Sequence, residues 1–554
     1  MLAPPDIWTV CKHDGVVAST VPGCAVVLIA AVGAAVGGAV EFTCPLSPQP
    51  MIVITKNALP MHRVVRVTAD MSIAVFYRES KSPCYRLAVM DEPDFLRAVA
   101  ERGIAYRATL RDAMVTPTAT PAELRASLGG PTPQHAADPV VVVNRMADAV
   151  EAGGLMAMDS GRFFGFVIGG ALPVALAADW LVTAWDQNTG LFAPSPATSV
   201  IEEIAGRWML DLLGLPPESS FAFVTGGQMA NTTALAAGRH HVLAAVGWDV
   251  EADGLVGSPS IRLVVGEEVH VTVPRAARLL GLGTKSIERV AVDANGAMLA
   301  ADLERVLAGD PGRPTIVCCQ AGNVNTGAID PIGELAAIAH AQGAWLHVDG
   351  AIGLWAAACR TTPRLVGIEQ ADSWSTDAHK WLNVPYDCGI VICRHHQSHR
   401  AAMTVTAAYL VQAAPGTDRD PVDWNPEFSR RARGVPVYAA LASLGREGIE
   451  AIVDRCCAHA RRFAEVLGAE PGVVVLNDVV LNQVLVQFLD PSGRDEDHDA
   501  RTRAVIAKVQ QDGTCWLGGS TWRNKAVMRI SVSNFATTDA DVEASIAAIL
   551  SAAR

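Results

Sequence analysis

The chain has no excess of basic residues and no regular cysteine framework, and both absences limit what it can do. Lys and Arg number 44 against 57 Asp and Glu, which gives a formal net charge of −13. Because a nucleic-acid surface needs clustered Lys and Arg, we expect no nucleic-acid partner. The 12 cysteines are scattered without the spacing of a disulfide framework. We therefore expect reduced thiols and a cytoplasmic protein.

The sequence also lacks internal repeats, low-complexity tracts and a strong membrane span. Its most apolar run, residues 24–40, is short and rich in Ala and Gly, whereas a spanning helix needs about 20 apolar residues. A membrane segment or a cleaved signal remains an alternative for this run. Residues 1–89 are predicted to be an extension of uncertain structure, and a membrane partner is not expected.

Length and composition predict an enzyme of more than one domain. The 554 residues exceed what one core usually serves, and 50% are apolar while 18% are charged. After the extension we expect an N-terminal helical segment over residues 90–160 and a large domain over residues 161–395. A polar loop region follows over residues 396–429, and a small C-terminal domain over residues 430–554.

The large domain alternates between short β-rich runs and helical stretches. Strands are predicted at residues 221–225, 263–265, 315–319, 344–348 and 389–393. This alternation predicts an α/β fold with a mostly parallel sheet between helices. Ligands of such sheets bind at the carboxyl ends of the strands, where the polar motifs fall. A long helix after residue 430 and a strand at residues 527–531 predict a second, smaller α/β domain.

Residues 372–383 carry the strongest chemical signal. Lys380 follows His379 and a run of small polar residues. A lysine desolvated in a cleft can form a Schiff base with an aldehyde, although an exposed helix lysine is the simpler reading. Upstream, Asp349 ends an apolar run. Buried carboxylates are rare unless paired, and a cationic ring nitrogen would be a suitable partner.

Two other motifs are weaker when taken alone. Gly226 and Gly227 follow a predicted strand and open a helix, so backbone amides could receive an anion there. Such a turn is more often only a turn. His270 also follows a strand; it could stack on a planar ring or be an ordinary capping histidine.

Together these motifs resemble the fold-type I enzymes that use pyridoxal phosphate (PLP), and specifically the group II decarboxylases. That family includes the aromatic-L-amino-acid, glutamate and histidine decarboxylases. The resemblance covers roughly residues 90–554 and extends to residues 161–166, 195–198, 325–331, 427–431 and 529–534. It implies the fold-type I transferase fold with a seven-stranded-type sheet, PLP as the cofactor, an amino-acid substrate and a homodimer.

The resemblance also implies roles around the cofactor ring. Lys380 would form the Schiff base, and Asp349 would keep the pyridine nitrogen protonated. His270 would stack on the ring face opposite Ala351, and Gln320 would lie beside the ring hydroxyl.

Further residues are implied around the phosphate and the substrate. The phosphate would be surrounded by Gly227, Gln228, Ser373 and Asp377. His379 would contact the phosphate or the reacting carboxylate, and Phe163, Phe164 and Phe166 would line the substrate pocket. Asp377 departs from the family, which often has Asn there, and a carboxylate beside a phosphate is unfavourable unless a proton or cation intervenes.

The implied reaction is decarboxylation of an L-amino acid to its amine and CO₂, and the three phenylalanines favour an aromatic or apolar substrate. In animal aromatic decarboxylases a loop tyrosine serves the protonation step, but residues 401–428 contain only Tyr409. The alternatives are an aminotransferase, with Arg529 holding the substrate carboxylate, another carbon–carbon lyase, or a non-catalytic PLP-binding protein.

No metal site is expected. Cys393, His395, His396 and His399 have metal-like spacing, but no second ligand pair lies nearby. We predict that the three histidines are surface residues.

Overall fold

The computed structural model describes residues 92–359, 365–407, 410, 412 and 418–554, together with short strands between residues 9 and 73. Residues 1–92 with 133–138 form one compact unit, and residues 93–132 with 139–554 form another. The first unit contains an antiparallel sheet and two antiparallel ribbons. Their strands are β1 (Thr9–His13), β2 (Val16–Thr20), β3 (Val27–Ala31), β4 (Val40–Phe42), β5 (Met51–Val53), β6 (Val65–Thr68) and β7 (Met71–Ile73).

In the second unit, helices occupy the segments where the sequence predicts them. The N-terminal helices are α1 (Glu92–Thr109), α2 (Pro121–Leu128) and α3 (Pro139–Glu151), followed by α4 (Pro173–Trp185) and α5 (Pro196–Leu213). Thr120 begins α2 with a capping box, since its side chain accepts from the Glu123 N–H and Glu123 bonds back to the Thr120 N–H. No helix within the described residues is both long and apolar enough to cross a membrane.

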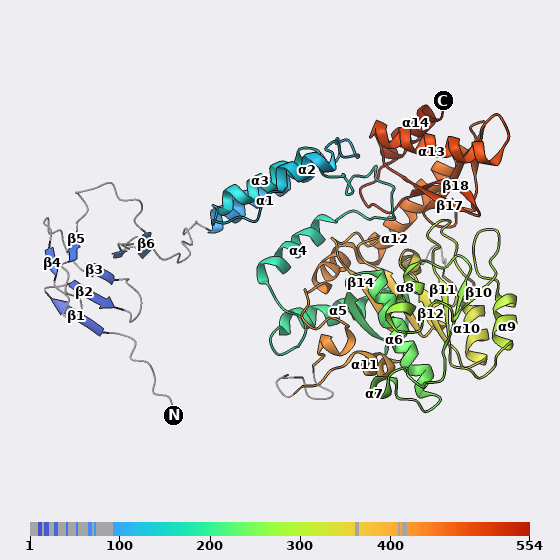
Figure 1. Ribbon diagram of the computed structural model, residues 1–554, viewed down its shortest axis with the longest axis horizontal. Helices are drawn as coiled ribbons and strands as arrows, with labels where there is room; N and C mark the ends of the chain where they lie inside the picture. Colours follow the sequence, from blue (N-terminus) through green and yellow to red (C-terminus); the bar gives the residue numbers. More distant parts are fainter. Residues whose placement is uncertain are drawn as a thin grey trace. The chain divides into compact units, whose positions relative to one another are not determined.

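A seven-stranded sheet forms the centre of the large domain (Figure 1). Its order is β10 (Ile287–Val290), β9 (Arg262–Gly266), β11 (Thr315–Gln320), β12 (Trp345–Asp349), β13 (Ser373–Asp377), β14 (Gly389–Cys393) and β8 (Ser220–Val224). Only β14 runs antiparallel to its neighbours, so the predicted mostly parallel sheet is confirmed. The strands β10 and β13 were not predicted from the sequence. The polar stretch of β13 is nevertheless entirely buried.

Helices cover both faces of this sheet, as the α/β prediction requires. One core cluster joins the sheet to α6 (Gly227–Ala244) and α8 (Thr272–Leu279). The other joins it to α5, α9 (Ala300–Ala308), α10 (Ile332–Ala341) and α12 (Gly434–Gly468). The remaining short helices are α7 (Val250–Asp253), η1 (Gly353–Ala358) and η2 (Ile368–Gln370).

The predicted polar loop at residues 396–429 is only partly a loop. It contains α11 (His396–Met403) and η3 (Pro421–Trp424). The ordering has a physical reason, because His399 is fully buried and bonds both the Ser220 hydroxyl and the Trp424 carbonyl. The prediction that His399 is a surface residue was therefore wrong.

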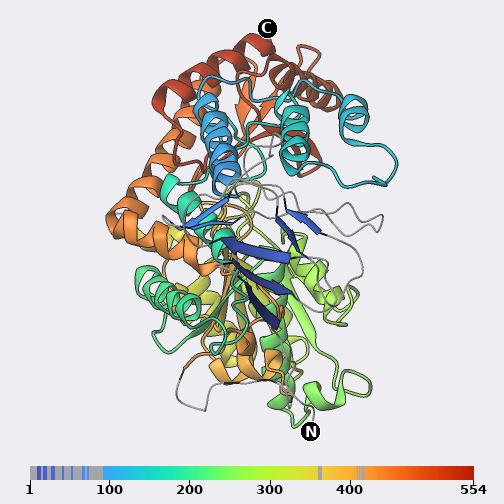
Figure 2. The same ribbon diagram turned by 90° about the vertical axis from the view of Figure 1, so that its left-hand side faces the viewer.

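The C-terminal part is the expected smaller α/β domain. An antiparallel sheet has the order β15 (Val473–Val475), β16 (Gln483–Phe488), β18 (Lys525–Ser531) and β17 (Gly518–Trp522). Helix α12 is broken at Gly445, whose φ of 58° lies in the left-handed region. Helices α13 (Asp495–Asp512) and α14 (Asp539–Ala553) lie at the same end of the unit as this sheet (Figure 2).

Candidate active site

Five of the predicted site residues gather at the carboxyl edge of the large sheet. Asp349 and Asp377 end β12 and β13, and Gln320 ends β11 directly opposite Asp349. Lys380 lies in the turn after β13, and Gly227 begins α6 after β8. The fold thus brings an amine, two carboxylates and a helix N-terminus to one edge.

Lys380 and Gly227 share a single partner, the carboxylate of Asp377. The Lys380 Nζ lies 2.8 Å from Asp377 Oδ2, and the Gly227 N–H donates to Asp377 Oδ1 over 2.6 Å. A Cβ on Gly227 would lie 2.8 Å from Asp377 Oδ2, so a larger residue would require the Asp377 carboxylate to shift.

Asp349 is buried and held by neutral donors. The residue is only 5% exposed. Asn231 Nδ2 donates to its Oδ2 over 3.0 Å, and the Ala351 N–H donates to its Oδ1 over 3.1 Å. No ion pair joins Asp349 to any cation of the described residues. A buried carboxylate without a cation is costly, so this site is suited to a cationic group on a ligand.

Asn231, which no prediction singled out, organises the layer beneath Asp349. Its Oδ1 accepts from His347 Nε2 and from the Ser375 hydroxyl over 2.9 and 2.6 Å. Because Nε2 of His347 donates, Nδ1 must accept from the Ser373 hydroxyl at 2.9 Å. Burial lowers the pKa of His347 to about 4, which keeps this ring neutral.

The same network corrects the expectation for Ser373. Ser373 starts β13, whereas Asp377 ends it. The Ser373 hydroxyl accepts from the Trp345 indole N–H over 2.9 Å. It is fully buried at the far end of the strand. Ser373 therefore supports His347 and does not face the amino end of α6.

His270 belongs to the site through Thr272. The Thr272 hydroxyl accepts from Asn231 Nδ2 over 3.0 Å and lies 2.8 Å from His270 Nδ1. The Thr272 backbone N–H also donates to Nδ1, over 3.4 Å, so Nδ1 is an acceptor and the proton of the neutral ring lies on Nε2. Burial lowers the pKa of His270, while Asp349 opposes and Lys380 adds to that shift. His270 is thus electrostatically coupled to both predicted partners of the cofactor.

The remaining polar predictions occupy adjoining positions. Gln228 donates to the Thr272 carbonyl over 3.1 Å, and Gln320 donates to the Glu268 carbonyl over 3.2 Å. Gln228 thus ties the start of α6, and Gln320 the end of β11, to the segment around His270. His379 Nδ1 accepts from the Cys388 N–H over 3.1 Å, and its Nε2 lies 3.4 Å from Asp377.

The three phenylalanines predicted to line the substrate pocket differ in exposure. Phe163 and Phe164 are each 1% exposed; Phe163 stacks on Trp516 and Phe164 packs edge-on against Phe463. They belong to the core of the molecule. Phe166 is 61% exposed and also stacks on Trp516, so it alone of the three presents a free surface.

Arg529 is a cation of the site. Burial lowers its pKa, and its charge contributes to lowering the pKa of His270. Its guanidinium donates to the Val324 carbonyl over 3.2 Å. This arrangement leaves other N–H groups for a ligand.

Comparison with known proteins gives the same picture. The sequence is 29% identical to the L-2,4-diaminobutyrate decarboxylase of Rhizobium meliloti (strain 1021), over 65% of this chain and 71% of that protein. It is 25% identical to the aromatic-L-amino-acid decarboxylase of Bacillus atrophaeus, over 75% of this chain and 85% of that protein.

The fold has the same relatives. The crystal structure of Oryza sativa TDC with PLP and tryptamine matches with a TM-score of 0.78 and 22% identity, covering 85% of this chain and 99% of that one. The model of the pyridoxal-dependent decarboxylase conserved domain matches residues 121–488. The chain belongs to the pyridoxal-dependent decarboxylase family and is a PLP-dependent amino-acid decarboxylase.

Proposed function

We propose that Lys380 is the amine that holds PLP and that Asp349 pairs with its ring nitrogen. The observation that carries this proposal is the buried Asp349 carboxylate, held by Asn231 and lacking a protein cation among the described residues. The amine of Lys380 lies at the same strand edge. Both charges act on the neutral ring of His270.

The residues present fit this cofactor. Asp349 suits a cationic nitrogen and the flat neutral ring of His270 suits stacking, while the amino end of α6 suits a phosphate once the Asp377 carboxylate no longer occupies it. When bound, PLP supplies an electron sink for the bond that breaks. The chain's own part is to hold Lys380 near the substrate amine and to present the Asp349 carboxylate to the ring nitrogen. Burial of Asp349 limits the access of water to its carboxylate.

The substrate class is a further proposal. We retain an aromatic or apolar L-amino acid, now supported by the exposed Phe166 face against Trp516. The cation of Arg529 favours a second candidate, an acidic L-amino acid. The acidic amino acid decarboxylase GADL1 of Mus musculus is 28% identical to this chain over 66% of it, with 68% of that protein covered.

A panel of L-amino acids, assayed for both CO₂ and amine, tests this function. The Lys380→Ala variant serves as the blank, and Arg529→Met separates the two substrate classes. We expect the blank to lose at least about a thousandfold in rate, equivalent to ~4 kcal/mol of barrier. Turnover of Lys380→Ala at the parent rate would refute the assignment.

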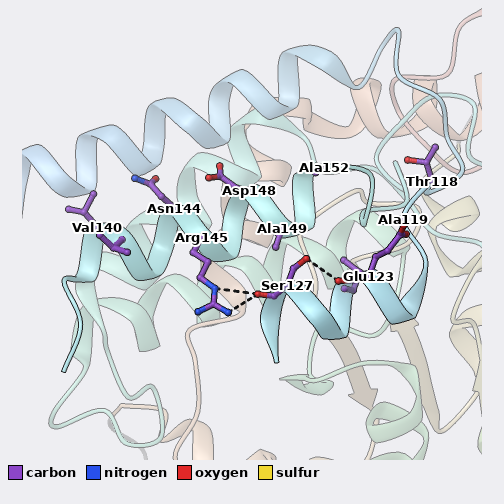
Figure 3. Close-up of a pocket in the computed structure, with 12 residues that line it drawn as sticks. Thr118, Ala119, Glu123, Ser127, Val140, Asn144, Arg145, Asp148, Ala149 and Ala152 are labelled. Atoms are coloured by element: carbon purple, nitrogen blue, oxygen red, sulfur yellow. Dashed lines mark hydrogen bonds between the residues drawn. The ribbon is translucent and has the colours of Figure 1, made fainter. Parts of the chain in front are cut away.

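We also propose a homodimer, which the N-terminal helices support. None of α1, α2 or α3 contains a buried residue. On α3, Val141, Val142 and Met146 are each more than half exposed. A groove of about 980 Å³ lies between α2 and α3, where Arg145 donates to the Ser127 carbonyl (Figure 3). Exposed apolar surface of this extent favours coverage by a second copy.

A cytoplasmic location is the matching proposal. Cys318, Cys388 and Cys393 are buried thiols that form no disulfide. Thiols that form no disulfide suit a reducing compartment.

A further inference from the structure

Asp377 occupies the place at the amino end of α6 where an anion would bind. Its Oδ1 accepts from the first amide of the helix, that of Gly227, over 2.6 Å. The residue is 2% exposed, so its carboxylate has little access to water. Free amides and the helix dipole favour an anion at this point, and here the protein supplies that anion itself.

The same carboxylate also holds the amine. Lys380 Nζ lies 2.8 Å from Asp377 Oδ2, and an amine engaged in that ion pair is not available to an aldehyde. The Asp377 side chain therefore binds both groups that the cofactor needs, the Gly227 amide and the Lys380 amine. A phosphate brought to the α6 terminus would face a buried negative charge, which is strongly unfavourable in a low-dielectric site.

We propose that Asp377 controls cofactor binding: it releases the Gly227 amide and the Lys380 amine when the phosphate arrives, and takes up one proton from solvent in the same step. This inference rests on the proposed role of Lys380. It predicts that PLP binds more tightly as the pH falls, and that removing the Asp377 charge removes this dependence.

The groups around Asp377 leave it as the acceptor of that proton. His379 is the nearest other group that could take the proton. Its Nδ1 already accepts from the Cys388 N–H, so a proton added at Nδ1 would be directed at that N–H. Burial raises the pKa of Tyr386 to about 12 and raises that of the Cys388 thiol, so both stay neutral. Lys380 already carries its proton in the ion pair.

Two other titratable groups lie in this neighbourhood. His270 has its pKa lowered by burial, and Asp387 acts on the pKa of His379 from the following turn. Both are present in every variant compared below, so their contributions cancel when slopes are compared.

The test measures the Kd of PLP and of pyridoxal, which lacks the phosphate, between pH 6 and 8.5. Cofactor-free full-length protein is titrated by absorbance and by calorimetry in buffers of different ionisation enthalpy. The variants are Asp377→Asn and, as a smaller neutral replacement, Asp377→Ser. Asp372→Asn is the matched control, because Asp372 precedes the same strand at its other end and is also buried.

We expect the wild-type Kd for PLP to rise with pH more steeply than that of Asp377→Asn, by up to about tenfold per pH unit for one linked proton. Calorimetry should show that extra proton only in wild type and in Asp372→Asn. For pyridoxal the slopes of wild type and Asp377→Asn should coincide.

Equal PLP slopes in wild type and both Asp377 variants would overturn the inference, as would a requirement for added Mg²⁺ in place of the proton. Failure of the proposed lysine would look different: Lys380→Ala would then develop the same cofactor absorbance band as wild type.

Discussion

Asp349 lies between an Asn231 amide and the Ala351 N–H, with no protein cation beside it among the described residues. If its charge holds the cofactor nitrogen, replacing that charge by an amide of the same shape weakens the electron sink. We expect Asp349→Asn to lower kcat by about 10²–10³-fold, with a smaller change in KM. Steady-state kinetics with saturating PLP check this.

A matched control for that variant is Asp330→Asn. Asp330 is also buried, accepts from the Met298 and Gln320 amides, and has its pKa raised to about 6 by burial. Both of its oxygens accept from backbone amides, so its loss should act mainly on stability. A larger kcat effect for Asp330→Asn than for Asp349→Asn would contradict the assignment.

The predicted residues that the fold brings to one edge are those whose position follows from a local motif. Lys380, Asp349 and Gly227 each stand at the end of a strand or the start of a helix, so the alternation of elements alone brings them to one edge. Ser373 failed because the same strand carries it to the opposite end. Asn231 could not be assigned from sequence, because its partners Asp349 and Ser375 lie 118 and 144 positions away.

At the scale of elements, a buried ion pair joins α5 to the segment that precedes α12. Arg430 donates to both carboxylate oxygens of Glu202 over 2.8 and 2.9 Å, and both side chains are at most 1% exposed. Arg430 also donates to the Phe223 carbonyl, at the end of β8. The sequence match at residues 427–431 therefore has a structural explanation.

Glu202→Gln should destabilise the fold by about 3–5 kcal/mol, because it leaves a buried guanidinium without its counter-charge. Urea unfolding followed by circular dichroism measures this. The neighbouring residue supplies the control: Glu203 pairs with Arg207 at the surface, so Glu203→Gln should cost less than about 1 kcal/mol. Equal effects of the two substitutions would refute the account.

A second contact between elements, that of Asp372 with two histidines, depends on pH. Asp372 bonds His340 through one oxygen and His395 through the other, each at 3.0 Å. Burial acts to raise the pKa of Asp372, but hydrogen bonds from His340, His395 and the Leu346 N–H lower it to about 2. The hydrogen bond to Asp372 in turn raises the pKa of His340.

The pKa of His340 is higher in the folded than in the unfolded protein. Its contribution to the stability of the fold is therefore complete when the pH is below its ordinary pKa of 6.5, and is lost as the pH rises through the pKa of the folded state. Asp372 stays charged throughout this range. We expect His340→Gln to destabilise the protein more at pH 5.5 than at pH 8.5, by less than about 1 kcal/mol because His340 is partly exposed. The exposed His396→Gln should show no such difference. A loss for His340→Gln that is independent of pH would contradict this.

Strand prediction failed at β13, where the buried residues are mostly polar. The strands β8, β9, β11, β12 and β14 contain apolar runs that can be predicted from the sequence. Strand β13 instead buries Ser, Thr and Asp beside one tryptophan. Asn231, His347 and Gly227 form hydrogen bonds with its Ser375, Ser373 and Asp377 side chains. Such compensation depends on tertiary contacts and leaves no pattern in the sequence.

At the scale of the whole molecule, the proposed dimer makes α3 the sensitive element. Val141 is 60% exposed in the single chain, so a charge there would not disturb the monomer's core. We expect wild type to have twice the 58.3 kDa chain mass and Val141→Lys to shift toward the monomer in light scattering. An exposed valine elsewhere, Val256→Lys, is the control. A monomeric wild type would refute the proposal.

The most direct test of the central claim is borohydride reduction of the PLP-loaded protein, followed by peptide mapping. Reduction fixes the cofactor to the amine that holds it. Between Lys285 and Lys508 the sequence has no lysine other than Lys380, so the labelled peptide is unambiguous. The account predicts one pyridoxyl group per chain, on Lys380. A label on Lys285, Lys508 or any other lysine, with Lys380 unmodified, would contradict it.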